Sequence, residues 1–242
     1  MDPKIYEQHE RLEAEHWWFR SKNRLIAHAA TKLARRGGRA VDIGCGTGGL
    51  LSLLGNTFRV QGIELEPIGR EVCKRRGLDV QDGCLPDGLP LKRGEFDLVV
   101  ASDVVEHVED DFGAVKALAE LLAPDGVLIV TVPAYMWMWG KHDELNHHKR
   151  RYTTTTLGSL VRATNLRIEM LSYRMISLFP LMALSRVLFP SGSPGLHVPP
   201  KPVNTTLEAL FAAERFLPQG FPAPFGGSVW CIARRAGQTQ AK

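Results

Sequence analysis

The sequence predicts an α/β fold in which a parallel β-sheet lies between two layers of helices. From residue 39 onward, short apolar runs alternate with segments of helical character, a pattern typical of parallel strands joined by crossover helices. The first apolar run leads into the glycine-rich stretch VDIGCGTGG at residues 41–49, which opens a helix. Turns of this kind bring backbone N–H groups close to a bound ligand. We therefore expect a ligand site where the first strand ends.

The segment before this core is expected to be helical, over residues 3–36, and carries the aromatic cluster HWWF at residues 16–19. The strands of the core are expected at residues 39–45, 59–65, 78–83, 96–103 and 126–134. The helices between them are expected at residues 48–56, 67–77 and 109–124. The last helix is the clearest, because acids in its first turn suit the helix dipole and Val115, Leu118 and Leu122 recur at helical spacing.

The part of the chain after the core is expected to supply two further strands. We expect a helix at residues 153–165, a strand at residues 166–175, a helix at residues 205–217 and a final strand at residues 227–235. A proline-rich insertion separates the first of these strands from the second helix. Its apolar stretch at residues 175–189 is interrupted by Pro180 and Arg186 and is too short to span a bilayer.

Composition and charge indicate a globular protein. The 242 residues suit one α/β domain with insertions, and 44% are hydrophobic and 23% charged. A net charge of +4, with basic residues in small clusters, permits an anionic substrate or a peripheral membrane contact but predicts no nucleic-acid partner. Four scattered cysteines without a CxxC pair, and an N-terminus without a signal-peptide pattern, predict a cytoplasmic protein.

The glycine loop allows two cofactors by spacing alone. Gly44, Gly46 and Gly49 satisfy the dinucleotide pattern, and Glu64 ends the second strand where a ribose-binding acid belongs. Asp42, two residues before the first glycine, would face a pyrophosphate with like charge but suits an ammonium or sulfonium group. S-adenosyl-L-methionine carries both of these cations and no phosphate. We therefore expect this cofactor, and an NAD(P)-dependent oxidoreductase is the alternative enzyme.

The motifs VDIGCGTGG, GIELEP, DGCLPDGLPLKRGEFDLVVASDVVEHV and LLAPDGVLIVTVPA occur in order along the core. In this the chain resembles the class I S-adenosylmethionine-dependent methyltransferases. The segments HWWF and HDELNHHKRRYT resemble a bacterial branch, similar to methyltransferase types 11 and 23, that acts on small molecules or on lipid- and saccharide-linked acceptors.

The resemblance implies a Rossmann-like three-layer sandwich whose seven-stranded, mostly parallel sheet has an antiparallel last strand. It divides the chain into an N-terminal helical cap at residues 1–38 and a methyltransferase domain at residues 39–242, with an insertion at about residues 176–218. The implied activity is methyl transfer to a small-molecule acceptor. A methyltransferase-fold binding protein without activity is the non-enzymatic alternative.

Cofactor-binding residues also follow from the resemblance. Asp42, Gly44 and Gly46 would surround the methionine part, and Glu64 would accept hydrogen bonds from the ribose hydroxyls. The remaining candidates are Cys45 in the glycine loop, Leu65 beside the adenine, Asp82 and Gly83 at its edge, and Ser102 and Asp103 beside the methyl group. From their place on the N-terminal helix, Trp17, Trp18 and Phe19 could cover the cofactor or could pack that helix on the sheet, and Trp18 is the candidate for ligand contact. Cys45 as a small loop residue, Glu64 as a solvated acid and Asp82 as a turn former are the structural alternatives.

Methyl transfer is a direct displacement, so the protein must align acceptor and methyl group, exclude water and in some cases remove a proton. Histidine is the first candidate for a base near neutral pH. His107 follows the fourth strand and is one such candidate, although with Glu106 it could instead orient the next helix.

The segment HDELNHHKRRYT at residues 142–153 comes directly after the fifth strand, at the edge where open α/β sheets bind ligands. We expect an acceptor-site loop that presents His142, Asp143, His147 and Tyr152. An Asp–Arg pair that pins the loop is the structural alternative. A metal site would use His142, Asp143 and either His147 or His148, but their spacing shows no diagnostic ligand framework, so we expect no metal. The candidate catalytic residues are His107, His142, His147 and Tyr152.

The insertion is rich in Leu, Phe, Met and Pro. It would line an apolar acceptor pocket or lie on a membrane surface with Arg174 and Arg186 outward, and a buried helix is the alternative. The partner is expected to be a small-molecule acceptor, with at most peripheral membrane contact. Nothing in the sequence selects oxygen, nitrogen or carbon as the accepting atom, or predicts the oligomeric state.

Overall fold

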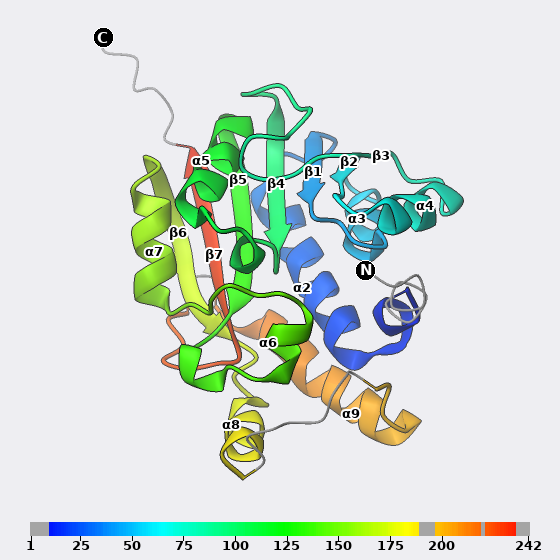
Figure 1. Ribbon diagram of the computed structural model, residues 1–242, viewed down its shortest axis with the longest axis vertical. Coiled ribbons are helices and arrows are strands. Elements are labelled where there is room, and N and C mark those ends of the chain that lie inside the picture. Colours follow the sequence, from blue (N-terminus) through cyan, green and yellow to red (C-terminus); the bar gives the residue numbers. More distant parts are fainter. Residues whose placement is uncertain (1–9, 189–196, 219–220, 236–242) are drawn as a thin grey trace.

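The computed structural model describes residues 10–188, 197–218 and 221–235. Seven strands form one sheet in the order β3-β2-β1-β4-β5-β7-β6 (Figure 1). The strands are β1 (Arg39–Ile43), β2 (Arg59–Ile63), β3 (Val80–Gln81), β4 (Phe96–Ser102), β5 (Leu122–Pro133), β6 (Leu166–Arg174) and β7 (Ser228–Arg235). β1 to β5 pair in parallel, and β7 pairs antiparallel with both β5 and β6. The expected mostly parallel sheet with an antiparallel last strand is confirmed.

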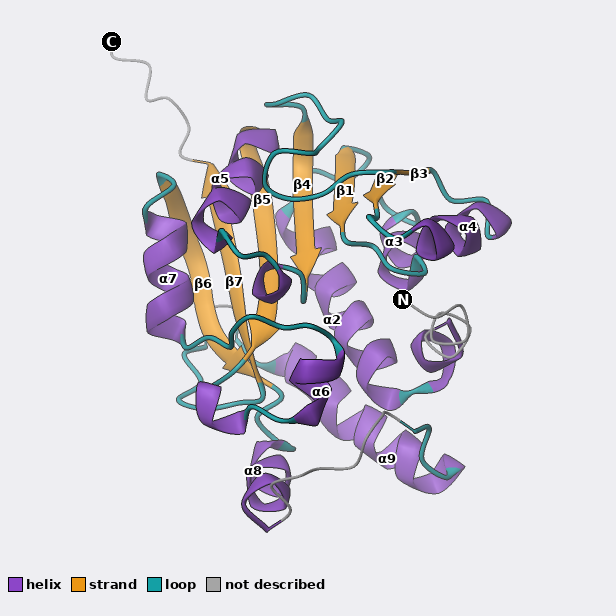
Figure 2. Ribbon diagram, viewed as in Figure 1, coloured by secondary structure: helices purple, strands orange, loops and turns teal. Residues whose placement is uncertain are grey.

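Helices cover both faces of the sheet, as Figure 2 shows. The helices are α2 (Trp17–Leu33), α3 (Gly49–Leu54), α4 (Pro67–Arg75), α5 (Asp111–Leu121), α6 (Lys141–Leu145), α7 (Thr154–Arg162), α8 (Phe179–Leu188) and α9 (Lys201–Ala212), with short 3-10 turns at Val105–His107, Met136–Met138 and Ala213–Phe216. α5 and α7 pack on one face, and α2 and α3 pack on the other. Along β1, Val41 and Ile43 join the first cluster and Ala40 joins the second, as alternation in a strand requires.

Several boundaries differ from the expectation, among them β3, which is shorter, and α9, which begins and ends earlier; two differences have a clear local cause. α5 ends at Leu121 and β5 begins at Leu122, earlier than expected, because Leu122 already pairs with Phe96 of β4 and Pro124 cannot continue a helix. The N-terminal helical segment is interrupted at His16, whose ring nitrogen caps α2 by accepting a hydrogen bond from the backbone of Trp18 (3.2 Å). The part of this expectation before residue 10 lies outside the described residues.

The N-terminal helix and the C-terminal insertion, which the sequence analysis treats separately, pack against each other. Asn204 of α9 is buried and bridges the start of α2: its side-chain oxygen accepts from the backbone of Trp17 (2.9 Å) and its amide donates to the carbonyl of Glu15 (2.8 Å). One turn further along α9, Glu208 pairs with Arg24 (2.5 Å). α9 therefore fixes where α2 begins.

α8 lies below the carboxyl ends of the parallel strands in Figure 1. The alternative of a buried helix is wrong, because none of its described residues is buried and Leu181, Leu184 and Val187 are more than half exposed. The outward placement of Arg174 is also wrong: its side chain is buried in the sheet, where it donates to Ser172 (3.4 Å). No helix within residues 10–188, 197–218 and 221–235 is long and apolar enough to cross a membrane.

Replacing Asn204 by alanine is expected to lower the free energy of unfolding by about 1–3 kcal/mol, because the buried backbone amide of Trp17 would lose its partner. Chemical denaturation monitored by tryptophan fluorescence measures this change. Thr205→Ala, at the exposed neighbouring position, is the control and is expected to change stability by less than about 0.5 kcal/mol. Equal effects of the two substitutions would contradict the bridging role of Asn204.

Candidate active site

A cavity of about 440 Å³ opens between α2, the carboxyl ends of β1 and β4, the segment around α6, and α8. It lies at the edge of the sheet where the sequence predicts a ligand. The candidate residues on its wall are Asp42, Gly44, Cys45, Gly46, Ser102, Asp103, Trp18, His107 and His142. The structure thus brings together residues from four separate segments of the chain.

The four candidates for contact with the ribose and the adenine do not lie on the cavity wall. They come directly after two neighbouring strands. Glu64 and Leu65 follow β2, and Asp82 and Gly83 follow β3. The side chain of Leu65 is 58% exposed, as expected for a surface against which a flat ring could lie. Asp82 forms an ion pair with Arg70 (2.8 Å), so it has a structural partner besides any ligand.

Two candidate catalytic residues point away from the cavity. The hydroxyl of Tyr152 is buried and donates to Asp111 at the start of α5 (3.0 Å). His147 is exposed, on a turn after α6 where its φ is 56°. Neither residue lies on the cavity wall, so in this structure both contribute to the loop's conformation.

The glycine loop adopts the conformation that its sequence predicts. Gly44 and Gly46 have φ values of 69° and 56°, a region that side chains disfavour. A Cβ at Gly44 would also approach Val104 to 2.6 Å. The carboxylate of Glu64 supports the loop by accepting from the backbone of Gly46 (2.8 Å). Glu64 is therefore a buried support of the loop and not a solvated acid.

Three carboxylates surround this loop, and those of Asp42 and Glu64 are buried. The third belongs to Glu13, which accepts hydrogen bonds from the hydroxyl of Thr47 and the backbone of Gly49. Burial raises the pKa of Asp42 well above its ordinary value, and the charge of Glu13 raises it further. Burial also raises the pKa of Glu13 and of Glu64. Acids in such surroundings favour a positively charged ligand.

Lys22 supplies the positive charge beside Asp103. Its ammonium lies 2.5 Å from the Asp103 carboxylate and 4.3 Å from the ring centre of Trp18. Asp103 has a φ of 56° and also accepts from the hydroxyl of Thr131 (3.0 Å). Strained conformations of this kind persist where several contacts hold them, often at functional sites.

Aromatic side chains close the cavity on the α2 side. Trp17, Trp18 and Phe19 all border it, although adjacent residues of a helix point in different directions. Trp17 also packs edge-to-face on Phe211 of α9 (6.2 Å between ring centres). The three residues therefore line the cavity, and Trp17 also packs α2 against α9.

The segment after β5 is pinned by Asp143, as the structural alternative in the sequence analysis expects. Asp143 is fully buried and accepts from Arg151 through two nitrogens (2.7 and 3.0 Å) and from Nδ1 of His148 (2.8 Å). Burial alone would raise the pKa of Asp143, but the hydrogen bonds from His148 and Arg151 hold it below its ordinary value. This clasp leaves His148, Arg151 and His142 on the cavity wall.

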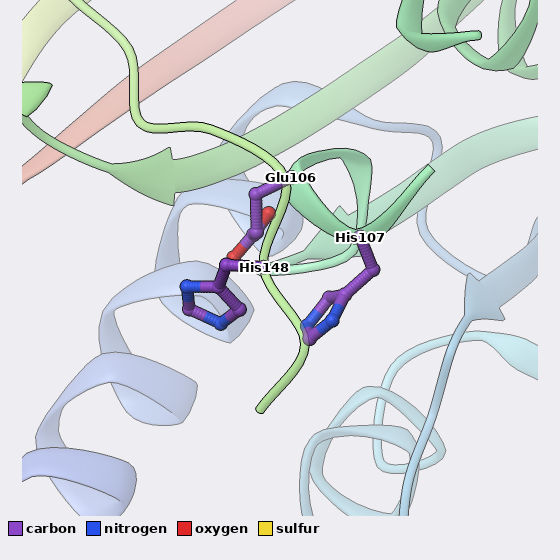
Figure 3. Close-up of side chains that lie close together, drawn as sticks. All are labelled: Glu106, His107 and His148. Carbon is purple, nitrogen blue, oxygen red and sulfur yellow. The ribbon is translucent and has the colours of Figure 1, made fainter. Parts of the chain in front are cut away.

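Glu106 and His107 occupy the 3-10 turn after β4, and their side chains lie beside His148 (Figure 3). The rings of His107 and His148 are 4.6 Å apart, centre to centre. Burial, with the neighbouring charge of His148, lowers the pKa of His107 to about 4, so its imidazole is neutral at pH 7. Burial, together with the charge of Asp103, raises the pKa of Glu106 well above its ordinary value.

Sequence reasoning did not single out Glu13, Lys22 or His148 as site residues. The acid and the lysine belong to an N-terminal helical segment, where a charged residue is usually solvated. His148 is adjacent to His147, and no pattern in HDELNHHKRRYT shows which of its histidines faces inward. Cys45, in contrast, behaves as a small loop residue, since hydrogen bonding to Cys73 and burial raise the pKa of its thiol.

Comparison with known proteins identifies the family. A family model described as a methyltransferase domain matches residues 12–186. The ubiquinone biosynthesis O-methyltransferase of Xanthomonas campestris pv. campestris is 30% identical over 135 residues, which cover 49% of this chain and 56% of that protein. The chain thus spans about half the length of the curated relatives it matches.

Solved structures share the fold. A SAM-dependent methyltransferase from Thermotoga maritima is 19% identical, with a TM-score of 0.58 over 97% of each chain. Phosphoethanolamine N-methyltransferase 2 of Haemonchus contortus, in complex with S-adenosyl-L-methionine, is 15% identical, with a TM-score of 0.59 over 89% of this chain and 53% of that chain.

Replacing Glu106 by glutamine is expected to raise the free energy of unfolding at neutral pH by about 1–3 kcal/mol, because it removes an acid whose ionisation is disfavoured by burial and whose oxygens have no hydrogen-bond partner among the described residues. Since the pKa of Glu106 is raised in the folded protein, the two proteins are expected to be equally stable below the ordinary glutamate pKa and to diverge as the pH rises above it. Urea unfolding between pH 4 and 8, with a chelator present, measures the difference. Glu144→Gln, at an exposed position, is the control, and a pH-independent difference for Glu106→Gln would contradict the assignment.

Proposed function

The chain belongs to the class I S-adenosylmethionine-dependent methyltransferases, and from this premise we propose that it methylates an oxygen atom of a small molecule with a lipophilic body. The observation that carries the proposal is a single cavity bordered on one side by Asp42 of the glycine loop and on another by His107 and His142. Cofactor and acceptor would share this cavity, and the wall between them is rich in aromatic side chains.

The residues fit the cofactor. S-adenosyl-L-methionine carries an ammonium and a sulfonium, which complement the buried carboxylate of Asp42 and the neighbouring carboxylate of Glu13 beside the loop. The backbone at Gly46, where a Cβ would meet nothing within 4 Å, leaves room for the ligand to approach. A nicotinamide dinucleotide would instead place its pyrophosphate among these acids, which disfavours the oxidoreductase alternative.

When bound, S-adenosylmethionine supplies a methyl group on a positively charged sulfur. A lone pair of the acceptor oxygen forms the new bond to this carbon while the carbon–sulfur bond breaks and its electron pair stays on sulfur. Trp17, Trp18 and Phe19 would exclude water from the reacting atoms. His142, on the opposite wall, would take up the hydroxyl proton.

An oxygen acceptor is supported by the relatives, which are named O-methyltransferases. A lipophilic body is supported by the walls, since Met175 and Met182 line the cavity beside the aromatic residues. α8 contributes Met182 and Arg186 to the cavity and exposes Leu184 and Leu188 by more than half. This arrangement suits a molecule whose polar head enters the cavity while its apolar part follows α8.

Calorimetric titration tests the cofactor site. The protein is expected to bind S-adenosylmethionine and S-adenosylhomocysteine but not NADH. Asp42→Asn is expected to weaken both adenosyl ligands about 10- to 100-fold, because a hydrogen bond to a charged group contributes about 1.5–3 kcal/mol. Asp87→Asn, at an exposed position, is the control. Binding of NADH without the adenosyl ligands would contradict the proposed reaction.

The acceptor is tested with a series of phenols that carry alkyl chains of increasing length, and with the matching anilines. We expect kcat/KM to rise with chain length for the phenols and turnover of the anilines to be negligible. Met182→Ala is expected to lower kcat/KM about 5- to 30-fold for the longest phenol only, through lost apolar contact. Leu181→Ala, on the exposed side of α8, is the control.

Faster turnover of the anilines would contradict the oxygen acceptor, and equal kcat/KM at all chain lengths would contradict the lipophilic body. Binding of S-adenosylmethionine without turnover of any acceptor in the series would favour the non-catalytic alternative.

A further inference from the structure

We infer that Glu106, His107 and His148 form a binding site for one divalent transition-metal cation beside the cofactor cavity. Each residue offers one ligand atom, and these atoms lie within 4.8 Å of one another. Two ligands of a zinc ion, each about 2.0–2.2 Å from it, lie at most about 4.4 Å apart. A small side-chain adjustment would therefore bring all three onto one ion.

Glu106 is the first support for this site. Its side chain is fully buried, and neither carboxylate oxygen has a hydrogen-bond partner in the described part of the chain. Buried polar groups are normally paired, and an exception needs a physical reason. The nearby cations bond elsewhere, since Lys22 pairs with Asp103 and Arg151 with Asp143. Figure 3 shows the Glu106 carboxylate directed toward His148.

His148 is held as metal-binding histidines usually are. Its Nδ1 bonds to the buried carboxylate of Asp143 (2.8 Å), which leaves Nε2 as the nitrogen available to a cation. A carboxylate behind the imidazole fixes the tautomer and the ring orientation, and it raises the basicity of the free nitrogen. Arg151 balances the charge of Asp143, which limits the repulsion between this carboxylate and that of Glu106.

His107 supplies the third ligand. It stands next to Glu106 on the 3-10 turn, and its ring lies edge-on to that of His148, with an interplanar angle of 89°. Among the three residues, Glu106 is buried and both histidines border the cavity.

The donor set selects the class of cation. Two imidazoles and one carboxylate suit Zn²⁺, Mn²⁺, Fe²⁺ or Co²⁺ better than Mg²⁺ or Ca²⁺, which prefer oxygen ligands. Three protein ligands leave at least one position open toward the cavity, as in catalytic metal sites. That position would hold the acceptor oxygen and lower the pKa of its hydroxyl, a role that rests on the proposed function. This site differs from the metal ligands that the segment at residues 142–153 suggests by itself, because Asp143 is occupied by Arg151 and His147 points outward.

Metal binding is measured on the full chain after chelator treatment. Titration with Zn²⁺, and with Co²⁺ followed by its visible absorption, is expected to show one site of micromolar or tighter affinity. Glu106→Gln and His148→Ala are expected to weaken binding at least 100-fold and to abolish the Co²⁺ spectrum. His147→Ala changes the adjacent exposed histidine and is the matched control, for which no change is expected.

Titration of each variant with S-adenosylmethionine separates the outcomes, because the metal site and the glycine loop are different residues. Retained cofactor binding with lost metal binding supports the site and shows that the variant is folded. A variant that loses both ligands is replaced by His107→Ala, for which the same result is expected. Absence of a stoichiometric site in the wild type, or equal weakening by His147→Ala, would overturn the inference without touching the proposed methyl transfer.

Discussion

The buried carboxylate of Asp143 is the contact on which the far wall of the cavity depends. It accepts hydrogen bonds from the backbone of Gly140, from His148 and from Arg151. Arg151 in turn donates to the carbonyl of Ala134, just after β5 (3.0 Å). One balanced charge therefore ties α6 and the segment after it to the sheet and orients His148. Breaking a buried pair of this kind is costly, because it leaves the partner charge unpaired.

Two other buried acids at the cavity, Asp42 and Glu106, lack a close ion-pair partner such as Arg151 provides for Asp143 among the described residues. Asp42 at β1 and Glu106 just after β4 lie at the carboxyl ends of neighbouring strands, and burial raises the pKa of both. Such acids reduce the stability of the free protein, and they are typical of sites where a positively charged ligand balances their charge. The positive charges of the cofactor would balance Asp42, and the proposed metal ion would balance Glu106.

Much of the fold could be predicted from the sequence because local patterns decide it. The strands and the apolar stripe of α5 can be recognised by their periodicity. The glycine loop and Asp42 lie within nine consecutive residues, 41–49, so their proximity can be read from the sequence. Glu13 and Lys22 were not predicted, because their roles arise only when the helical turn before α2 packs on the glycine loop and α2 itself packs beside Asp103. The inward side of the segment at residues 142–153 was also beyond sequence reasoning, since His147 and His148 are adjacent residues of the same type and only the structure shows which of them bonds to Asp143.

Because Asn204 holds the start of α2, one wall of the cavity depends on a residue that is synthesised long after that helix. The aromatic residues that close the cavity are synthesised before the side chain that fixes their helix, which lies 187 positions later. Until α9 has been synthesised, the wall formed by Trp17 and Trp18 lacks this support. A nascent chain can thus form β1 to β5 before α9 exists, but the aromatic wall of its binding cavity gains this support only after α9 has been synthesised.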